Sequence, residues 1–287
     1  YQRSRGLGDV YKRQGICNIM NGHPTLDNKT YDMYHKNLFH TKLINMDIVS
    51  PEPYRLNEYF NQKCDIAQAF DMLINNKGIR ELPAPTLILS KEELLEGRKA
   101  IDEIKKKVKK EKLVIIQPFG RAITQIDNSF VDKSNRSIEF SNLKQIIKKL
   151  QEKDWAVCIM SEFGIEFKDA GFKDEVAIPE IPDLRKWAGL IKYADHFLGC
   201  DSVGQHLAKA METPASVVMG ATYPINTSYP NDKNFTIIDM GQFDREYDPI
   251  RISFDERISR KHERIMTMTP EIEDYVVSAV NGDPIEE

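Results

Sequence analysis

Polar residues that could hold a phosphate group gather between residues 199 and 206. This stretch reads Gly-Cys-Asp-Ser-Val-Gly-Gln-His, and an apolar run gives way to a helical pattern within it. The first N–H groups of a helix lack partners in the helix and carry about half a positive charge, so they attract anions. Asp201 and Ser202 are typical capping residues, Gly204 lets the backbone approach a ligand, and His206 adds an imidazole on the first turn. The pattern predicts a phosphate-binding turn.

The same residues also allow a purely structural interpretation. In that case Asp201 and Ser202 only cap the helix, and His206 packs as a neutral core histidine. A second tight loop, Gly220-Ala-Thr222-Tyr-Pro224, follows the next apolar run and is expected at the same edge of the fold. The residue types alone do not choose between the two interpretations.

The elements that would position these loops alternate regularly after residue 112. The expected strands are 113–117, 156–160, 176–178, 196–199, 215–219 and 235–239, and the expected helices are 141–152, one from 183 and one from about 204. Strands that alternate with helices indicate a parallel sheet covered by helices on both faces. Such sheets bind ligands at the carboxyl ends of their strands. The loops after Gln117, Met160, Gly199 and Met219 are therefore the predicted site.

The flanking regions are less regular. Residues 15–85 are polar, rich in aromatic residues and broken by prolines, which indicates short helices and loops. A helix over about 91–110 begins with a capping box formed by Ser90 and Glu93, and the six lysines of 105–112 are expected on its solvated face. A helix from Thr269 is expected to pack against another element. Residues 1–14 resemble translated adapter sequence rather than a signal peptide, and we leave them out of the fold argument.

Composition narrows the class of protein. The 287 residues include 41% hydrophobic residues, the net charge is −4, and no apolar run has the length of a membrane span, which together indicate a soluble globular protein. An acidic balance argues against a nucleic-acid binder. The four cysteines lie far apart, which suggests neither a zinc site nor disulfides and favours a reducing, cytoplasmic setting. The nucleotide-binding motifs G-x-x-x-x-G-K-[ST] and G-x-G-x-x-G and the metalloprotease motif H-E-x-x-H do not occur, which disfavours metal-dependent phosphotransfer and dinucleotide oxidoreduction.

The segment 193–224 resembles the C-terminal half of the heptosyltransferase-type glycosyltransferases, glycosyltransferase family 9. That family has a strand, then Asp-Ser/Thr-Gly-x-x-His-Leu-Ala, then a second strand and Gly-x-Thr-x-Pro. The matching residues are Asp201, Ser202, His206, Leu207, Ala208, Pro214, Gly220, Thr222 and Pro224. One position departs from the pattern, because Val203 stands at the family's glycine and Gly204 follows one place later.

The resemblance continues upstream in sparser form. Gln117-Pro-Phe-Gly120 occupies the position of the family's His-Pro-Gly loop, with its glycine one residue late. Arg136 stands where the family has the lysine of Lys-x-Trp-Pro, and would neutralise a diphosphate with a planar fork. A solvated surface arginine is the alternative. Glu162 or Glu166 is a candidate to hold a ribose hydroxyl.

The resemblance implies an α/β protein of the GT-B type. In that arrangement two Rossmann-like domains face each other across a cleft, and the second holds the donor. We expect a non-native stretch at 1–14, a partial N-terminal domain with the acceptor side at 15–90, a linker helix at 91–112, a Rossmann-like nucleotide-sugar domain at 113–245 and a helical tail at 246–287.

The implied function is transfer of a sugar, with heptose as the leading candidate, from a nucleotide-diphosphate donor to a cell-surface glycan or lipopolysaccharide. The transfer would be inverting and independent of metal or cofactor, and the protein could be peripheral at the inner membrane. The donor-binding candidates are Gly120, Arg136, Glu162, Glu166, Asp201, Ser202, Gly204, Gln205, His206, Gly220 and Thr222. No catalytic base is assigned, since it is expected in a missing N-terminal part, and Asp9 is not nominated. A nucleotide-sugar epimerase and a non-catalytic nucleotide-sugar-binding module are the alternatives.

Overall fold

A computed structural model describes residues 51, 53, 56–120, 123–126, 129–132, 134–161, 165, 167, 171–242 and 265–283. Residues 1–14, Asp9, Glu162 and Glu166 lie outside the described residues, so the predictions made for them stay predictions. The chain divides into two compact units, one of 1–53 with 70–77 and one of 54–69 with 78–287. In the first unit, the described part of 70–77 continues helix α5 (Ile66–Asn75).

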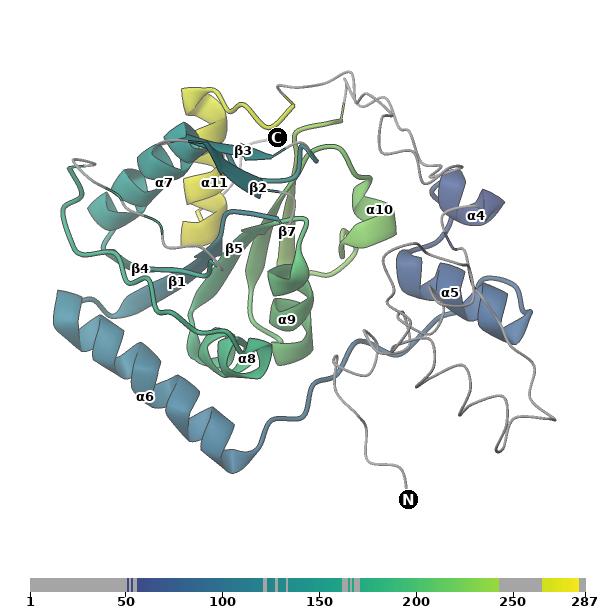
Figure 1. The fold of residues 1–287 in the computed structure, drawn as a ribbon, viewed down its shortest axis with the longest axis horizontal. Helices are drawn as coiled ribbons and strands as arrows, with labels where there is room; N and C mark the ends of the chain where they lie inside the picture. Colours follow the sequence, from purple (N-terminus) through teal and green to yellow (C-terminus); the bar gives the residue numbers. More distant parts are fainter. Residues whose placement is uncertain are drawn as a thin grey trace, which may run out of the picture. The chain divides into compact units, whose positions relative to one another are not determined.

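A parallel sheet forms the centre of the second unit. Its described strands are β1 (Lys112–Gln117), β4 (Trp155–Ile159), β5 (His196–Cys200), β6 (Ala215–Met219) and β7 (Phe235–Asp239), in the order β4-β1-β5-β6-β7 with every pair parallel (Figure 1). Each of the five agrees with its expected range within one residue at either end. The prediction of a sixth strand at 176–178 was wrong. The described residues there form a single bridge, between Ala177 and Cys158.

Helices cover both faces of the sheet. Helices α7 (Phe140–Glu152) and α11 (Pro270–Asn281) pack on one face, and α8 (Leu184–Tyr193) and α9 (Val203–Met211) pack on the other (Figure 1). Each face of the sheet has its own hydrophobic core, and β1 contributes to both. Val114 and Ile116 pack in the core under α7 and α11, and Leu113 and Ile115 pack in the core under α8 and α9. Alternate side chains of a strand point to opposite faces, so a strand buried on both sides reads as a continuous apolar run.

The chain changes direction in the sheet between β1 and β5. From β1 it passes through α7 to β4 on one side, and from β5 it passes through α9 to β6 on the other. The two helices lie on opposite faces, so the loops after β1 and β5 separate at this point. In open α/β sheets this switch point is where ligands bind.

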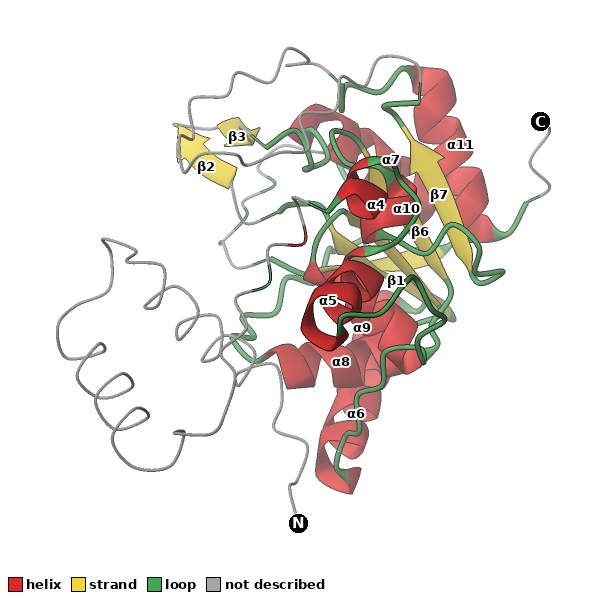
Figure 2. Cartoon of the chain, turned by 90° about the vertical axis from the view of Figure 1, so that its right-hand side faces the viewer, coloured by secondary structure: helices red, strands yellow, loops and turns green. Residues whose placement is uncertain are grey.

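A hairpin follows β1 where the sequence predicted a polar loop. Strands β2 (Ile123–Ile126) and β3 (Ser129–Asp132) pair antiparallel, with Ile123 opposite Asp132 (Figure 2). The loop prediction was wrong because four-residue strands leave almost no periodic signal. The hairpin brings Asp132 and the residues after it back toward the end of β1.

Helix α6 (Lys91–Val108) packs along α8. The predicted capping box of Ser90 and Glu93 is confirmed. A Cβ atom on Gly97 would lie 2.4 Å from the carbonyl carbon of Gly189, so the two backbones touch. The lysine run is less solvated than expected, because Lys105 pairs with Asp195 at 2.6 Å and Lys110 pairs with Asp154.

The segment before α6 is tied to the sheet through α10 (Pro224–Thr227). Asn226 is buried, and its Nδ2 donates to the carbonyl oxygens of Tyr59, at 3.0 Å, and Cys64, at 2.9 Å. Tyr59 belongs to helix α4 (Asn57–Phe60). The Asn226 side chain therefore holds the segment around α4 by hydrogen bonds to residues more than 160 positions away in the sequence.

Three of the cysteines, Cys64, Cys158 and Cys200, are buried free thiols. Burial raises the pKa of Cys64 to about 11 and that of Cys158 to about 12, and it also raises the pKa of Cys200. None of the described helices has the combination of length and apolar character that crossing a bilayer requires.

Candidate functional site

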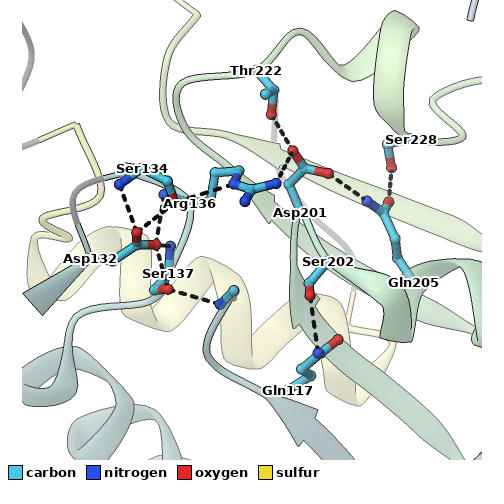
Figure 3. Close-up of polar contacts among 11 residues, drawn as sticks. Gln117, Asp132, Ser134, Arg136, Ser137, Asp201, Ser202, Gln205, Thr222 and Ser228 are labelled. Carbon is cyan, nitrogen blue, oxygen red and sulfur yellow. Dashed lines mark hydrogen bonds and ion pairs between the residues drawn. The ribbon is translucent and has the colours of Figure 1, made fainter. Parts of the chain in front are cut away.

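Polar side chains from three loops meet at the carboxyl edge of the sheet (Figure 3). Asp201 follows β5, Thr222 follows β6, and Arg136 comes from the loop that returns from the hairpin to α7. The Thr222 hydroxyl donates to Asp201 Oδ2 at 2.8 Å, and Arg136 Nη1 lies 3.9 Å from the same oxygen. The structure thus brings together three residues that the sequence placed in separate loops.

Asp201 contacts both other members of the Arg136–Asp201–Thr222 cluster. It is 5% exposed, and its Oδ1 accepts a hydrogen bond from Gln205 Nε2 at 3.1 Å. Gln205 is itself held by the Ser228 hydroxyl, which donates to Oε1 at 2.6 Å. A buried carboxylate is tolerated only when it is paired and hydrogen-bonded, and both conditions are met here. Because both oxygens are engaged, Asp201 fixes the loops rather than offering a free base.

Arg136 is held by a carboxylate-centred turn. Asp132 Oδ1 accepts from the Ser134 backbone N–H at 2.7 Å, and Oδ2 accepts from the Ser137 N–H at 2.9 Å and the Ser137 hydroxyl at 2.6 Å. Burial by itself would raise the pKa of Asp132, but the hydrogen bonds from Ser134 and Ser137 outweigh it and hold the pKa below its usual value. The turn leaves the Arg136 side chain 31% exposed, which keeps this cation accessible at the edge of the sheet.

The sequence interpretation missed Asp132, Ser134 and Ser137. Their signal is local, since an aspartate followed closely by serines is typical of a side-chain-stabilised turn. Gly120, which was predicted at the site, is joined to this turn because its N–H donates to the Ser137 hydroxyl at 2.9 Å. The loop after β1 and the Arg136 turn are thereby connected.

The explanation given for Gly204 was wrong. A Cβ atom there would lie 2.3 Å from Gln117 Oε1 and 2.4 Å from Phe197 Cζ, so the space belongs to these side chains rather than to a ligand. The Gly204 N–H donates to Gln117 Oε1 at 2.7 Å. The first turn of α9 is therefore partly closed by Gln117.

Ser202 is the N-cap residue of α9, but its side chain makes no capping hydrogen bond there. Its hydroxyl instead accepts a hydrogen bond from Gln117 Nε2 at 3.1 Å. The expectation that Asp201 and Ser202 cap the helix with their side chains is corrected accordingly. Gln117 Oε1 accepts from the Gly204 N–H instead. This N–H is one of the donors at a helix start that the side chain of an N-cap residue usually satisfies.

His206 faces Tyr229. Its Nδ1 lies 2.8 Å from the Tyr229 hydroxyl, and burial lowers the pKa of His206 even though the nearby Asp201 acts in the opposite direction. Burial also raises the pKa of Tyr229 to about 12. His206 is therefore a neutral, hydrogen-bonded imidazole at pH 7, which agrees with the structural interpretation of this residue.

Gly220 lies where two loops touch. A Cβ atom there would come within 2.5 Å of both the Asn135 carbonyl oxygen and Met266 Sδ, and the neighbouring Ala221 N–H donates to that carbonyl at 3.2 Å. Glycine is needed for the loop after β6 to contact the Arg136 turn. This contact helps to set the distance between Arg136 and Thr222.

A cavity of about 400 Å³ opens at the opposite, amino edge of the sheet. Lys112, Trp155, His196 and Lys233 are among its lining residues. His196 donates to or accepts from the Ser216 hydroxyl at 2.9 Å, and burial lowers its pKa to about 4. Ligands of parallel sheets bind at the other edge, so the candidate site remains the Arg136–Asp201–Thr222 cluster.

The group that this cluster can offer to a ligand is the Arg136 side chain, which is 31% exposed. Its accessible charge is a guanidinium, which presents a rigid fork of donors suited to phosphate. The described residues contain no group of three or more His, Cys, Asp or Glu side chains placed to hold a metal ion.

Comparison with known proteins gives a similarity of fold. No protein-family profile matches the chain, and no curated protein sequence matches it. Among solved structures it is similar to a glycosyl transferase family 9 protein from Veillonella parvula, with 9% identity over 76% of this chain and 59% of that one and a TM-score of 0.52. It is also similar to the ADP-heptose lipopolysaccharide heptosyltransferase II of E. coli, with 14% identity over 76% and 61% of the two chains and a TM-score of 0.49.

A third solved structure is the iron-containing heptosyltransferase TibC from enterotoxigenic E. coli, in complex with ADP-D-β-D-heptose. It shares 13% identity over 77% of this chain and 54% of that one, with a TM-score of 0.43. The chain spans 61% and 59% of the length of the first two proteins. The similarity to the family 9 structure confirms the expected α/β fold of the GT-B type.

Proposed function

We propose that this chain is the donor-binding part of a glycosyltransferase. It binds a nucleotide-diphosphate sugar, with heptose as the sugar, for transfer to a cell-surface glycan such as lipopolysaccharide. The observation that carries the proposal is the Arg136 cation held beside Asp201 and Thr222 at the switch point of a parallel sheet. The fold that the chain shares with a glycosyl transferase family 9 protein supports it.

The chemistry follows from how the glycosidic bond breaks. The leaving nucleoside diphosphate gains negative charge, and donors already fixed in place stabilise that charge without reorganising. Arg136 supplies a bidentate fork, and the hydroxyl of Ser202 and the start of α9 supply further donors. The proposed reaction is inverting and uses no metal. The three cysteines that the structure describes are unpaired thiols, which fits the reducing cytoplasm as the proposed compartment.

Binding of ADP tests the donor site. Isothermal titration calorimetry should detect ADP binding, with GDP and UDP as comparison nucleotides. Arg136→Ala should weaken binding by about 10- to 100-fold, since a charged hydrogen-bonding partner of the diphosphate is lost. Arg136→Lys should restore part of the affinity, because the charge returns without the fork.

Arg98→Ala is the matched control for this experiment. Arg98 lies on α6 with 68% of its side chain exposed, and among the described residues it forms a 3.9 Å pair with Asp102, so its removal should leave ADP affinity unchanged. Equal affinities of wild type and Arg136→Ala would contradict the assignment of the site. With the full-length protein, ADP-heptose and a lipopolysaccharide acceptor, a transferred sugar supports a transferase, an isomerised sugar indicates an epimerase, and binding alone indicates a non-catalytic module.

A further inference from the structure

Gln117 connects the two places where this sequence departs from the family 9 pattern. The first departure is the Gln117-Pro-Phe-Gly120 loop, and the second is the glycine that stands at 204 instead of 203. In the structure these departures are in contact, because Gly204 N–H donates to Gln117 Oε1 at 2.7 Å. A Cβ atom at 204 would lie 2.3 Å from Gln117 Oε1 and 2.4 Å from Phe197 Cζ, so the glutamine can take this position only beside a glycine.

The direction of the Gln117 amide is fixed by chemistry. A backbone N–H can only donate, so the amide atom that faces Gly204 must be the carbonyl oxygen. The other end is then the NH₂ group, which donates to Ser202 Oγ at 3.1 Å. Gln117 is 8% exposed, so packing holds this arrangement in place.

This arrangement determines what Ser202 can do. Its oxygen accepts the hydrogen bond from Gln117, so its own hydrogen must point elsewhere. Among the described residues Ser202 makes no other side-chain hydrogen bond, and its side chain makes no capping bond to α9. The hydroxyl hydrogen is left as a donor at the carboxyl edge of β5, next to Asp201 in the chain.

We propose that Gln117 is a positioning residue that orients the Ser202 hydroxyl as a donor to an anionic ligand, namely the diphosphate of the donor sugar. This inference rests on the proposed function. In this proposal Gln117 acts through Ser202, because its Oε1 accepts from the Gly204 N–H and its Nε2 donates to the Ser202 hydroxyl oxygen. It acts by removing the rotational freedom of the Ser202 hydroxyl before the ligand arrives.

A double-mutant cycle between Gln117→Met and Ser202→Ala tests the inference, with ADP and inorganic pyrophosphate as probes in calorimetric titrations. Methionine has a similar length and cannot donate or accept in the same way. We expect Ser202→Ala to weaken binding about tenfold. In the otherwise wild-type protein, Gln117→Met should weaken binding about three- to tenfold. In the Ser202→Ala background, Gln117→Met should change the affinity by less than about twofold, because the hydroxyl it positions is gone.

Gln151→Met controls for the loss of a buried amide. Gln151 is fully buried and bonds Lys173 N–H and the Asp174 backbone, so its replacement should lower stability and leave both probes bound as before. Thermal melts of all variants confirm that they are folded at the titration temperature.

The possible outcomes separate the two proposals. Equal effects of Gln117→Met in both backgrounds, or no effect in either, overturn the positioning role while the donor site stands. Coupling seen with pyrophosphate but no binding of any nucleoside diphosphate keeps the positioning role and overturns the nucleotide-sugar function. No binding of either probe to the wild-type chain overturns both.

Discussion

At the scale of single residues, the candidate site is held together by carboxylates that accept several hydrogen bonds each. Asp132 is the clearest case, since its two oxygens gather the backbone and hydroxyl groups of Ser134 and Ser137. Arg136 lies inside this turn, and its own N–H reaches Asp132 Oδ2 at 3.3 Å. The position of the proposed diphosphate-binding cation therefore depends on an aspartate whose two oxygens accept hydrogen bonds from the turn itself.

Asp132→Asn should disturb this turn. An amide offers one acceptor oxygen instead of two, so some of the partly buried donors of the turn lose their partner. We expect the free energy of unfolding to fall by about 1–3 kcal/mol in urea denaturation, and the ADP affinity to fall with it as Arg136 loosens. An unchanged ADP affinity together with a lowered stability would mean that the turn does not position Arg136.

His196 should make stability depend on pH. Burial lowers its pKa from 6.5 to about 4, so the folded state resists protonation more than the unfolded state does. Its contribution is complete above pH 6.5 and is lost as the pH falls toward 4, by at most about 1.4 kcal/mol per pH unit. Urea denaturation between pH 7 and pH 4.5 should show this loss.

His196→Gln removes the titrating group and keeps a polar partner for Ser216. Its unfolding free energy should fall less steeply over the same pH range than that of the wild type. Identical slopes for the two proteins would assign the acid sensitivity to other groups, of which His206 is the first candidate because burial lowers its pKa too.

At this scale the sequence predicted types of residue better than their contacts. The arrival of Thr222 and Arg136 at Asp201 could be anticipated, because parallel strands deliver their loops to one edge. The hydrogen bond from Gly204 to Gln117 could not, since 87 positions separate the two residues and no periodic pattern links them. A glycine near a helix start suggested room for a ligand, whereas the space is filled by a side chain from another strand.

At the scale of elements, the contact between α6 and α8 depends on two glycines. A methyl group on Gly97 would lie 2.4 Å from the carbonyl carbon and oxygen of Gly189, and backbone atoms cannot move aside cheaply. Arg185 of α8 reinforces the contact by donating from Nε and Nη2 to the Glu93 carboxylate, at 2.5 and 2.8 Å. The two helices are thus matched in shape and in charge.

Gly97→Ala should lower the free energy of unfolding by about 1–3 kcal/mol despite the better helix propensity of alanine, because overpacking forces the helices apart. Gly78→Ala is the control, since nothing lies within 4 Å of a Cβ atom at that position. Urea denaturation measures both changes. Equal stability of the two variants would show that α6 can shift on α8 without cost.

The elements themselves were largely predictable, because their signals are local. Ser90 caps the helix that follows it, as the sequence predicted, and Asp183 and Thr269 cap the helices that were expected to start there. The apolar runs of the parallel strands stood out from polar surroundings. The hairpin of β2 and β3 was missed because its strands are only four residues long. The bridge at Ala177 looked like a strand because a short apolar run also occurs where a loop packs on a core.

At the scale of the whole molecule, the segment around α4 belongs to the same compact unit as the sheet, although the sequence grouped it with the irregular N-terminal region. Asn226 provides two of the hydrogen bonds that hold it. Asn226→Ala should therefore speed the hydrogen exchange of 56–69, as measured by mass spectrometry, while the strands exchange as slowly as before.

Asn61→Ala serves as the comparison for this prediction. Asn61 is the exposed C-cap residue of α4, and its Nδ2 donates to the Asn57 carbonyl of that helix, so removing it should not release the segment. Exchange of 56–69 at the wild-type rate in Asn226→Ala would show that apolar contacts suffice to hold it.

The three buried thiols give this chain its own set of chemical reporters. An alkylating reagent attacks a thiolate, and Cys64, Cys158 and Cys200 are both shielded from it and kept protonated by their raised pKa values. Cys64 lies within the segment 56–69 that Asn226 holds, whereas Cys158 lies in β4 and Cys200 in β5. The order in which peptides carrying these thiols become labelled would reveal whether the chain opens first at its periphery or through its centre, without any dye being attached.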